Sequence, residues 1–522
     1  MFYFRIVISV LALIAYWFVL RYNLHMFQLN GYKNDEHMHW LKIKWRKQAL
    51  AIVLFVTALL LLAVGSMNVF CHIILLFELW ISIKFFRFQK EINTKKKLVF
   101  TMRVKRLMAT KIILSICLVV VFFVLFKVSG ILPGICIAAS LTPVSLVLAN
   151  ILNAPLEKAV NNYYINDAKN ILKKNSHIKV IGVTGSYGKT SVKFYLNTLL
   201  SEKFNVLVTP ESYNTPMGIV KTIRGSMKSS HEIFICEMGA RRVSQIKEIC
   251  DIVNPQHGII TSVGPQHLET FGSIDNVLKT KFELADSLPE GGMLFLNGDN
   301  ELIVNKAKEY ENTYFYSAGE ESLGYHAENI ELSQLGTKFT VVAPNGERCE
   351  FQTRLVGQHN VVNIVGAIAV ANTLGISLEE LKVPVRKIQS VPHRMQLIER
   401  GNVTVIDDAF NSNPVGSKAA VETLKLFDGL RILITPGMVE LGDKEEEYNF
   451  KFGGYAAQCC DYIFLVGKKR TEAIMNGALH SGFSAEKCIA FDNLSDAMAK
   501  ATSISSDKHK FILLENDLPD NY

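Results

Sequence analysis

The sequence predicts an α-helical membrane domain followed by two α/β domains, the first with a phosphate-binding loop and the second Rossmann-like. Nearly all long apolar runs of the 522-residue chain lie in residues 1–150. From His177 onward, short β-branched runs alternate with helix-compatible segments, which is typical of a doubly wound α/β domain. A glycine-punctuated turn follows the first of those runs. We place the membrane domain at 1–153, the central domain at 177–375 and the C-terminal domain at 392–522.

Charge divides the chain in the same way. Residues 1–150 hold 18 Lys and Arg against 4 Asp and Glu, whereas residues 151–522 hold 38 against 44. The basic excess therefore lies beside the apolar runs, and the net charge of +8 does not indicate nucleic-acid binding. We expect the bilayer, and no nucleic acid, as a partner.

Five apolar runs are predicted to cross the membrane, several of them near the short end of the ~17–25 residues that a helical crossing needs. A cleaved signal peptide explains the first run poorly, because no small-residue cleavage site precedes the polar stretch that follows it. The predicted spans are Ile6–Leu20, Ala49–Gly65, Val69–Phe85, Ile112–Phe126 and Ile131–Leu152.

The loops between these spans predict their orientation. Residues 21–48 hold six Lys and Arg and residues 86–111 hold nine, whereas the alternate connections, 66–68 and 127–130, hold only Lys127. Basic loops remain in the cytoplasm, so five spans place the N-terminus outside. We expect a multi-pass protein of the cytoplasmic membrane with cytoplasmic catalytic domains. Its nine cysteines, which include no C-x-x-C pair, are then reduced thiols.

Residues 178–194 have the order of strand, glycine turn and helix in which a phosphate-binding loop occurs. The glycines let successive N–H groups converge on phosphate oxygens at a helix N-terminus. Lys189 would reach the outer phosphates, and the Thr190 hydroxyl would ligate Mg²⁺. The strict pattern has glycine where Val183 stands, and the alternative is a strand-to-helix turn with an incidental lysine. The predicted nucleotide-binding residues of the loop are Gly185, Ser186, Gly188, Lys189, Thr190 and Ser191.

Two more predicted strands end in polar residues. Glu237 follows Glu232–Cys236, and His267 comes soon after Gly258–Ser262. In open α/β sheets the carboxyl ends of the strands line the ligand crevice. Both side chains are therefore candidate metal ligands beside the phosphate loop, although each is also compatible with an ordinary polar loop.

Nine motifs, in matching order and spacing, make the sequence from about Lys179 to Leu441 similar to the Mur ligase family. The first three motifs lie in the first part of the central domain, and one of them contains the phosphate loop. The motifs are Gly-Ser-Tyr-Gly-Lys-Thr-Ser-Val-Lys (185–193), Asn-Thr-Pro-Met-Gly-Ile (214–219), Glu-Met-Gly-Ala (237–240), His-Leu-Glu-Thr-Phe-Gly-Ser (267–273), Lys-Thr-Lys-Phe-Glu-Leu (279–284), Leu-Asn-Gly-Asp-Asn (296–300), Gly-Gln-His-Asn-Val-Val-Asn (357–363), Pro-His-Arg-Met (392–395) and Asp-Asp-Ala-Phe-Asn-Ser-Asn-Pro (407–414).

The resemblance implies an ATP-dependent amide ligase of cell-wall synthesis. Such enzymes phosphorylate a substrate carboxylate with ATP and let an amine attack the acyl phosphate. By resemblance, Thr190 and Glu237 would hold one Mg²⁺ and His267 the second. Lys281 matches a lysine that family members carbamylate, which turns a cation into an anion that can ligate or orient Mg²⁺. Apart from the resemblance, Lys281 is compatible with a surface lysine that pairs with Glu283.

The resemblance also assigns residues to the nucleotide. Asn297 and Asp299 would border the adenine, and Arg394 and Asp408 would close onto the phosphates and ribose from the C-terminal domain. Such a two-domain site implies closure during catalysis, with a hinge at Gly375–Val391. A helix with His359, Asn360 and Asn363 would border the nucleotide.

Further segments complete the predicted domains. Alternation within Tyr325–Arg354 predicts a small β extension of the central domain. Four strands are predicted for the C-terminal domain, near Val403–Ile406, Arg431–Thr435, Tyr462–Val466 and Phe511–Leu514.

Two features depart from the family pattern and leave both substrates open. The membrane spans stand where relatives carry a soluble domain that grips a UDP-sugar. An acidic run over 514–522 replaces a Lys-Gly-Ser-Arg-like turn. We expect a cell-envelope precursor, UDP-linked or lipid-linked, as the carboxylate acceptor, and an amino acid or D-Ala-D-Ala-like amine. The alternatives are a non-catalytic membrane scaffold and, more weakly, a P-loop transporter ATPase. Retention of Lys189, Thr190, Glu237, His267 and Lys281 together favours the ligase.

Overall fold

The computed structural model describes residues 2–44, 49–63, 69–92, 97–211, 213–319, 324–410 and 412–517. The chain forms two compact units, one of residues up to Tyr163 and one that begins at Tyr164. The predicted span end at Gly65 and the acidic tail from residue 518 lie outside the described residues.

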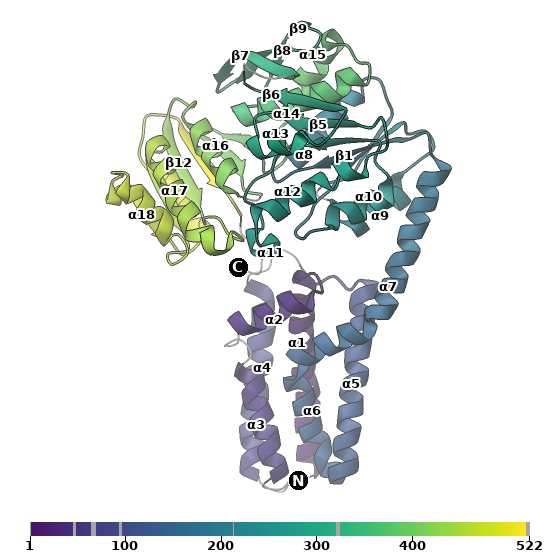
Figure 1. Ribbon diagram of the computed structural model, residues 1–522. Coiled ribbons are helices and arrows are strands. Elements are labelled where there is room, and N and C mark those ends of the chain that lie inside the picture. Colours follow the sequence, from purple (N-terminus) through teal and green to yellow (C-terminus); the bar gives the residue numbers. More distant parts are fainter. Residues whose placement is uncertain are drawn as a thin grey trace. The chain divides into compact units, whose positions relative to one another are not determined.

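The described part of the N-terminal unit is helical (Figure 1). Buried apolar residues of α1, α3, α4 and α6, such as Ile8, Leu54, Leu75 and Cys136, form its main core. The helices are α1 (Phe2–Leu29), α2 (Asn34–Ile43), α3 (Ala49–Ala63), α4 (Val69–Ile92), α5 (Met102–Phe126), α6 (Ile131–Ser140) and α7 (Thr142–Lys174), whose last part belongs to the second unit.

Two helical stretches of the described chain, Ile6–Leu29 and Met102–Ser140, are long and apolar enough to cross a membrane, by length and composition alone. Ala51–Ala63 is a shorter apolar helix. The first apolar stretch is longer than the predicted span Ile6–Leu20, since α1 continues to Leu29. The predicted span Ile131–Leu152 is also not one helix, because α6 ends at Ser140 and α7 starts at Thr142. Pro143 explains the break, since proline is tolerated in a first helical turn but not in a helix interior.

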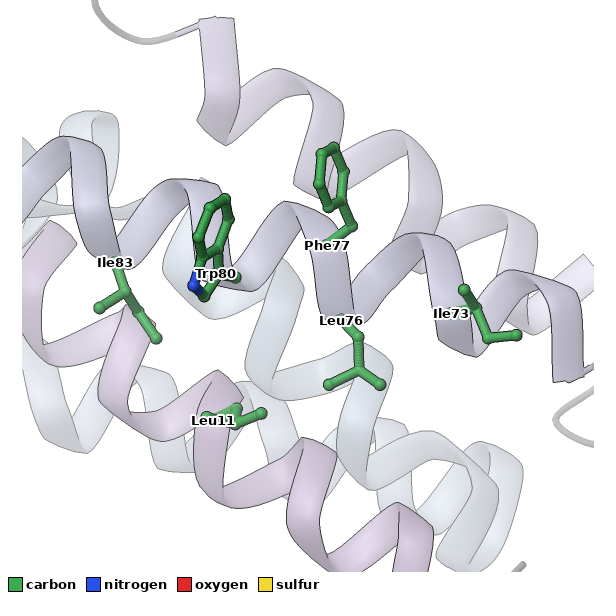
Figure 2. Close-up of a pocket in the computed structure, with 6 residues that line it drawn as sticks. All are labelled: Leu11, Ile73, Leu76, Phe77, Trp80 and Ile83. Carbon is green, nitrogen blue, oxygen red and sulfur yellow. The ribbon is translucent and has the colours of Figure 1, made fainter.

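Side chains of α1 and α4 line an apolar cavity of about 390 Å³ in this unit. Figure 2 shows its lining residues. Two of them, Phe77 and Trp80, are also 63% and 52% exposed. Exposed apolar side chains that are grouped in one place are typical of protein, ligand or membrane contact surfaces. The lining residues are Leu11, Ile73, Leu76, Phe77, Trp80 and Ile83.

The second unit contains a nine-stranded sheet in the order β2-β3-β1-β4-β5-β6-β7-β8-β9. The strands from β2 to β7 pair in parallel, and β7, β8 and β9 pair antiparallel, as the predicted β extension requires. The strands are β1 (Lys179–Thr184), β2 (Val206–Val208), β3 (Ile233–Glu237), β4 (His257–Ile260), β5 (Met293–Asn297), β6 (Thr313–Ser317), β7 (Tyr325–Ser333), β8 (Gly336–Val342) and β9 (Arg348–Thr353).

Helices cover both faces of this sheet (Figure 1), so its parallel strands are buried apolar runs. One face packs against α8 (Lys189–Leu200), α14 (Gln358–Thr373) and α15 (Leu378–Lys387). The other packs against α9 (Pro216–Ser226), α10 (Gln245–Val253), α12 (Ile274–Phe282) and α13 (Glu301–Ala307), with the short α11 (Leu268–Phe271) beside α12.

The predicted hinge at Gly375–Val391 is not a free linker. It contains α15, which starts at a capping box formed by Ser377 and Glu380. Leu378, Leu381 and Val385 of this helix are fully buried in the core of the central sheet. Sequence reasoning missed this helix because Pro384 lies inside it.

A second, six-stranded sheet has the order β10-β11-β15-β12-β13-β14, with only β10 antiparallel. The four predicted strands are confirmed as β11 (Val403–Asp408), β12 (Leu430–Thr435), β13 (Tyr462–Val466) and β15 (Lys510–Glu515), whereas β10 (Gln396–Arg400) and β14 (Cys488–Phe491) were not predicted. Helices α16 (Pro414–Leu424), α17 (Glu445–Cys459), α18 (Glu472–His480) and α19 (Leu494–Ser503) complete this part.

Candidate active site

The loop between β1 and α8 requires glycine at two positions. Gly185 and Gly188 have φ angles of 149° and 78°, which L-residues with side chains rarely adopt. A Cβ at Gly185 would lie 2.1 Å from Thr261 Oγ1, and one at Gly188 would lie 2.6 Å from Asn363 Oδ1. The loop is therefore packed closely against the end of β4 and against α14, with its N–H groups at the start of α8.

Lys189 lies over this loop. Its ammonium donates hydrogen bonds to the carbonyl oxygens of Gly185 at 2.6 Å and Ser186 at 2.9 Å. Burial lowers the pKa of Lys189 to about 8, an effect that Glu237 opposes and Arg394 reinforces. The charge is thus held where the phosphates of a bound nucleotide would lie. Ser191 is buried in the first turn of the same helix.

Glu237, at the end of β3, is the contact point of three side chains. Its Oε1 accepts hydrogen bonds from Thr190 Oγ1 and Asn214 Nδ2, each at 3.1 Å. Its Oε2 lies 3.0 Å from Lys193 Nζ, and the side chains of Lys193 and Glu237 are 0% and 1% exposed. Thr190 and Glu237 come from separate motifs, and the structure brings them into contact.

These residues fit a Mg²⁺ site that phosphates complete. Among the described residues, no group of three or more His, Cys, Asp or Glu could hold a metal ion. Mg²⁺, however, is usually held by one or two carboxylates together with substrate phosphates and water. Glu237 Oε2 is buried and, within the described part of the chain, it pairs with the Lys193 ammonium, which is 3.0 Å away but not aligned as a hydrogen-bond donor. A carboxylate and a hydroxyl beside a phosphate loop supply the hard oxygen donors that this ion prefers.

His267 follows β4 with a positive φ of 52° and precedes α11. Its Nδ1 is hydrogen-bonded to a carboxylate oxygen of Glu440, and Arg241 Nη1 lies 3.3 Å from the other oxygen. Burial lowers the pKa of His267, an effect opposed by Glu440. The loop after β4 is thereby connected to the loop after β12. The assignment of His267 to a second Mg²⁺ stays a prediction.

Lys281, on α12, is 1% exposed, so the alternative of a surface lysine is wrong. The Glu283 carboxylate instead accepts hydrogen bonds from the backbone N–H groups of Ser244 at 2.7 Å and Lys247 at 3.0 Å. Burial lowers the pKa of Lys281 well below its ordinary value, and the charge of Lys189 lowers it further. Burial therefore favours the neutral amine form of this side chain.

Arg394 and Asp408 approach the same cluster from the second sheet. Burial lowers the pKa of Arg394, whereas the charges of Asp408 and Glu237 raise it. Its guanidinium carbon lies 4.5 Å from the centre of the Phe410 ring. Burial raises the pKa of Asp408 to about 6, although Arg394 opposes the shift. Arg394 is thus close enough to Glu237 and Lys189 to belong to one site with them.

Asn297 and Asp299 lie at the end of β5. Asn297 Nδ2 donates a hydrogen bond to the carbonyl oxygen of Thr261 at 2.8 Å. The hydroxyl of Thr261 in turn lies against Gly185 of the phosphate loop. Asp299 Oδ2 accepts from Ala318 N at 2.8 Å, and burial raises its pKa. Asn297 is thus linked to the phosphate loop through Thr261, whereas Asp299 contacts the segment after β6. No described contact tests the role of either residue toward adenine.

The three predicted residues of α14 differ in position. Asn363 contacts the phosphate loop at Gly188. Asn360 accepts a hydrogen bond from Tyr195 of α8 at 2.7 Å, which joins the two helices. Burial lowers the pKa of His359 to about 4, so this side chain is neutral.

Three residues of the cluster had no role predicted from the sequence. Lys193 lies one helical turn after Lys189, a spacing that places both on the same side of α8 and could have identified it. Asn214 lies in one of the recognised motifs. No local sequence pattern indicated a role for Glu440, because its contact with His267 joins residues that are 173 positions apart in the chain.

Comparison with known proteins identifies both α/β parts of the chain. Residues 183–371 match the Mur ligase middle domain, and residues 393–515 match the Mur ligase glutamate ligase domain. UDP-N-acetylmuramoyl-tripeptide–D-alanyl-D-alanine ligases of Escherichia coli and Bacillus subtilis are 31% and 30% identical over 297 and 294 residues, or 56% of this chain. The matched regions cover 65% and 63% of those relatives, less than two thirds of their length.

Solved structures show the same fold. MurF ligase from Thermotoga maritima, in complex with ADP, superposes with a TM-score of 0.62 at 25% identity, over 68% of this chain and 80% of that one. MurF from Acinetobacter baumannii superposes with a TM-score of 0.63 at 24% identity, over 69% and 78% of the two chains.

Proposed function

The chain belongs to the Mur ligase family, whose two matched domains cover more than half of its residues, and we propose that it is an ATP-dependent amide ligase of peptidoglycan synthesis. The observation that carries this proposal is the contact between Thr190 and Glu237 beside Lys189 on a closely packed phosphate loop. A carboxylate acceptor and an amine are the substrates, as in the reactions named for its relatives.

The reaction consists of two transfers. An oxygen of the acceptor carboxylate attacks the γ-phosphorus of ATP, and ADP leaves. The amine then attacks the carbonyl carbon of the acyl phosphate, loses a proton and expels phosphate, which leaves an amide. Lys189 and Arg394 stabilise the negative charge on the transferring phosphoryl group. Mg²⁺ bound at Thr190 and Glu237 would add further positive charge there.

Lys281 fits a carbamylated lysine. Carbamylation requires a neutral amine that attacks CO₂ and then loses a proton, so the N–C bond forms and the product is an anion. Burial lowers the pKa of Lys281 and so favours that neutral form. The resulting carbamate is an anion that would lie near the positive charge of Lys189, which stabilises it.

The N-terminal helices would anchor the ligase in the cytoplasmic membrane as a multi-pass domain. Support comes from the two long apolar stretches, the exposed apolar side chains and the two basic loops of the sequence. This proposal places both α/β parts on the side where ATP is available.

A topology test follows from that arrangement. Reporters fused after Tyr522 and inserted near Lys96, a position outside the described residues, are expected to be cytoplasmic, because positive loops stay on that side. The measurement is the activity of a paired phosphatase and fluorescent reporter in intact cells. A reporter inserted near Ser129 is the control and should lie outside. External activity at either of the first two positions would contradict the five-span topology.

The acceptor is expected to be lipid-linked or membrane-proximal. The α/β part begins at about residue 177, some two dozen residues after the last apolar run. A site tethered so near the bilayer meets membrane-bound substrates at a high effective concentration. The bilayer would thereby take over part of the recognition that relatives obtain from a UDP-sugar domain.

The test supplies both acceptors to full-length protein in nanodiscs. UDP-muramoyl tripeptide and its lipid-linked counterpart are each offered with ATP, Mg²⁺ and D-Ala-D-Ala, and the product is identified by mass spectrometry. We expect at least tenfold higher turnover per unit concentration with the lipid-linked acceptor. Efficient use of only the soluble acceptor would refute the preference but retain the ligase. Nucleotide binding without any amide product would favour the scaffold instead.

A further inference from the structure

Lys193 is a fully buried lysine that connects three segments of the active site. Its ammonium lies 3.0 Å from Glu237 Oε2 at the end of β3 and also donates to the carbonyl oxygen of Glu211. The lysine itself stands on α8, one turn after Lys189 and Thr190. Since Asn214 donates to Oε1 of the same carboxylate, Lys193 and Asn214 hold the two oxygens of Glu237 from different sides.

The charges around Glu237 determine the electrostatic potential at the proposed metal site. A buried carboxylate is strongly unfavourable unless it is paired, and Lys193 supplies the pair. With that pair neutral, the remaining charges near the loop are the cations Lys189 and Arg394 and, beside Arg394, the carboxyl group of Asp408, so that positive charge is in excess. A divalent cation without phosphates therefore enters surroundings that are already positive. ATP brings several negative charges and reverses this balance.

We propose that Lys193 is a positioning residue that acts as an internal counter-ion of Glu237 and makes metal binding there conditional on the phosphates of ATP. The lysine keeps the carboxylate in place while no nucleotide is bound. It also weakens binding of the free ion, so that metal and nucleotide enter the site together. This inference rests on the proposed role of Glu237 as a metal ligand.

The test uses Lys193→Met in the full-length protein in detergent, since methionine keeps most of the side-chain volume and removes the charge. Binding of Mn²⁺, a paramagnetic substitute for Mg²⁺, is measured by electron paramagnetic resonance with and without a non-hydrolysable ATP analogue. Without nucleotide, the variant is expected to bind Mn²⁺ at least tenfold more tightly than the wild type, because a bare carboxylate now faces the ion. With the analogue, the two proteins should differ less than threefold.

Lys203→Met is the matched control. Lys203 follows the same helix and also donates to a backbone carbonyl, that of Gly375 at 2.6 Å, but this contact is exposed to solvent. Removal of the Lys203 charge should leave the Mn²⁺ affinity unchanged, both with and without the ATP analogue. The double variant Lys193→Met/Glu237→Gln should lose the gain in affinity, since no unpaired carboxylate remains.

The outcomes separate this inference from the proposed function. Unchanged Mn²⁺ affinity in Lys193→Met, together with lost Mn²⁺–nucleotide binding in Glu237→Gln, would overturn the counter-ion role and leave the ligase intact. Full Mn²⁺–nucleotide binding by Glu237→Gln would remove the metal role of Glu237 and this inference with it. If Lys193→Met does not fold, recovery of folding in the double variant supports charge compensation, and failure of both variants overturns it.

Discussion

Replacement of Lys189 by alanine is expected to lower ATP-dependent ligation about 10³-fold or more. The ammonium lies against the carbonyl oxygens of Gly185 and Ser186, over the loop that would hold the phosphates. Negative charge spreads over the transferring phosphoryl group in the transition state, and a nearby cation stabilises that charge. The loss should therefore appear in kcat more than in the KM for the acceptor.

The measurement is amide formation by full-length protein at saturating ATP, with the melting temperature measured in parallel. Lys203→Ala is the control, because it removes an exposed lysine just after the same helix and should leave turnover unchanged. An unchanged kcat in Lys189→Ala would show that the glycine loop does not hold the reacting phosphates. A large loss of stability in place of activity would instead indicate that the lysine mainly supports the loop.

The parts of the site that sequence reasoning predicted are those carried by local patterns. The phosphate loop could be predicted because strand, Gly185, Gly188 and helix follow one another directly. Glu237 could be located because it ends a strand next to β1 in the sheet, where ligands of open α/β folds gather. In both cases, a short stretch contains the information that determines the geometry.

The features that sequence reasoning missed depend on contacts between segments that are distant in the chain, or on single residues that interrupt a local pattern. The burial of Lys281 follows from the packing of α12 against the sheet, which no local pattern of its charged segment reveals. The contact between His267 and Glu440 joins loops of two different sheets. In the N-terminal unit, the hydropathy of Ile131–Leu152 gave no sign that Pro143 starts a new helix.

Lys281→Ala is expected to lower turnover at least 10²-fold, and added short-chain carboxylates are expected to restore part of it. Alanine removes the carbamate and leaves a space in a buried position. A small anion such as acetate or formate can enter that space and replace the missing negative charge near Lys189. Rescue should rise with carboxylate concentration and reach a plateau. Wild-type activity should fall in CO₂-depleted buffer and return with bicarbonate.

Lys279→Ala provides the control on the same helix, since Lys279 is exposed and its removal should change neither turnover nor the response to carboxylates. Intact-protein mass spectrometry is a weak readout here, because carbamates are lost under acidic conditions; ¹³C NMR with labelled bicarbonate at neutral pH observes the adduct directly. A ¹³C signal that is present in the wild type and missing from Lys281→Ala would assign the carbamate to Lys281. An active Lys281→Ala enzyme that responds to neither carboxylate nor bicarbonate would mean that the buried amine serves packing alone, because a metal-orienting anion cannot be removed from such a site without loss of turnover.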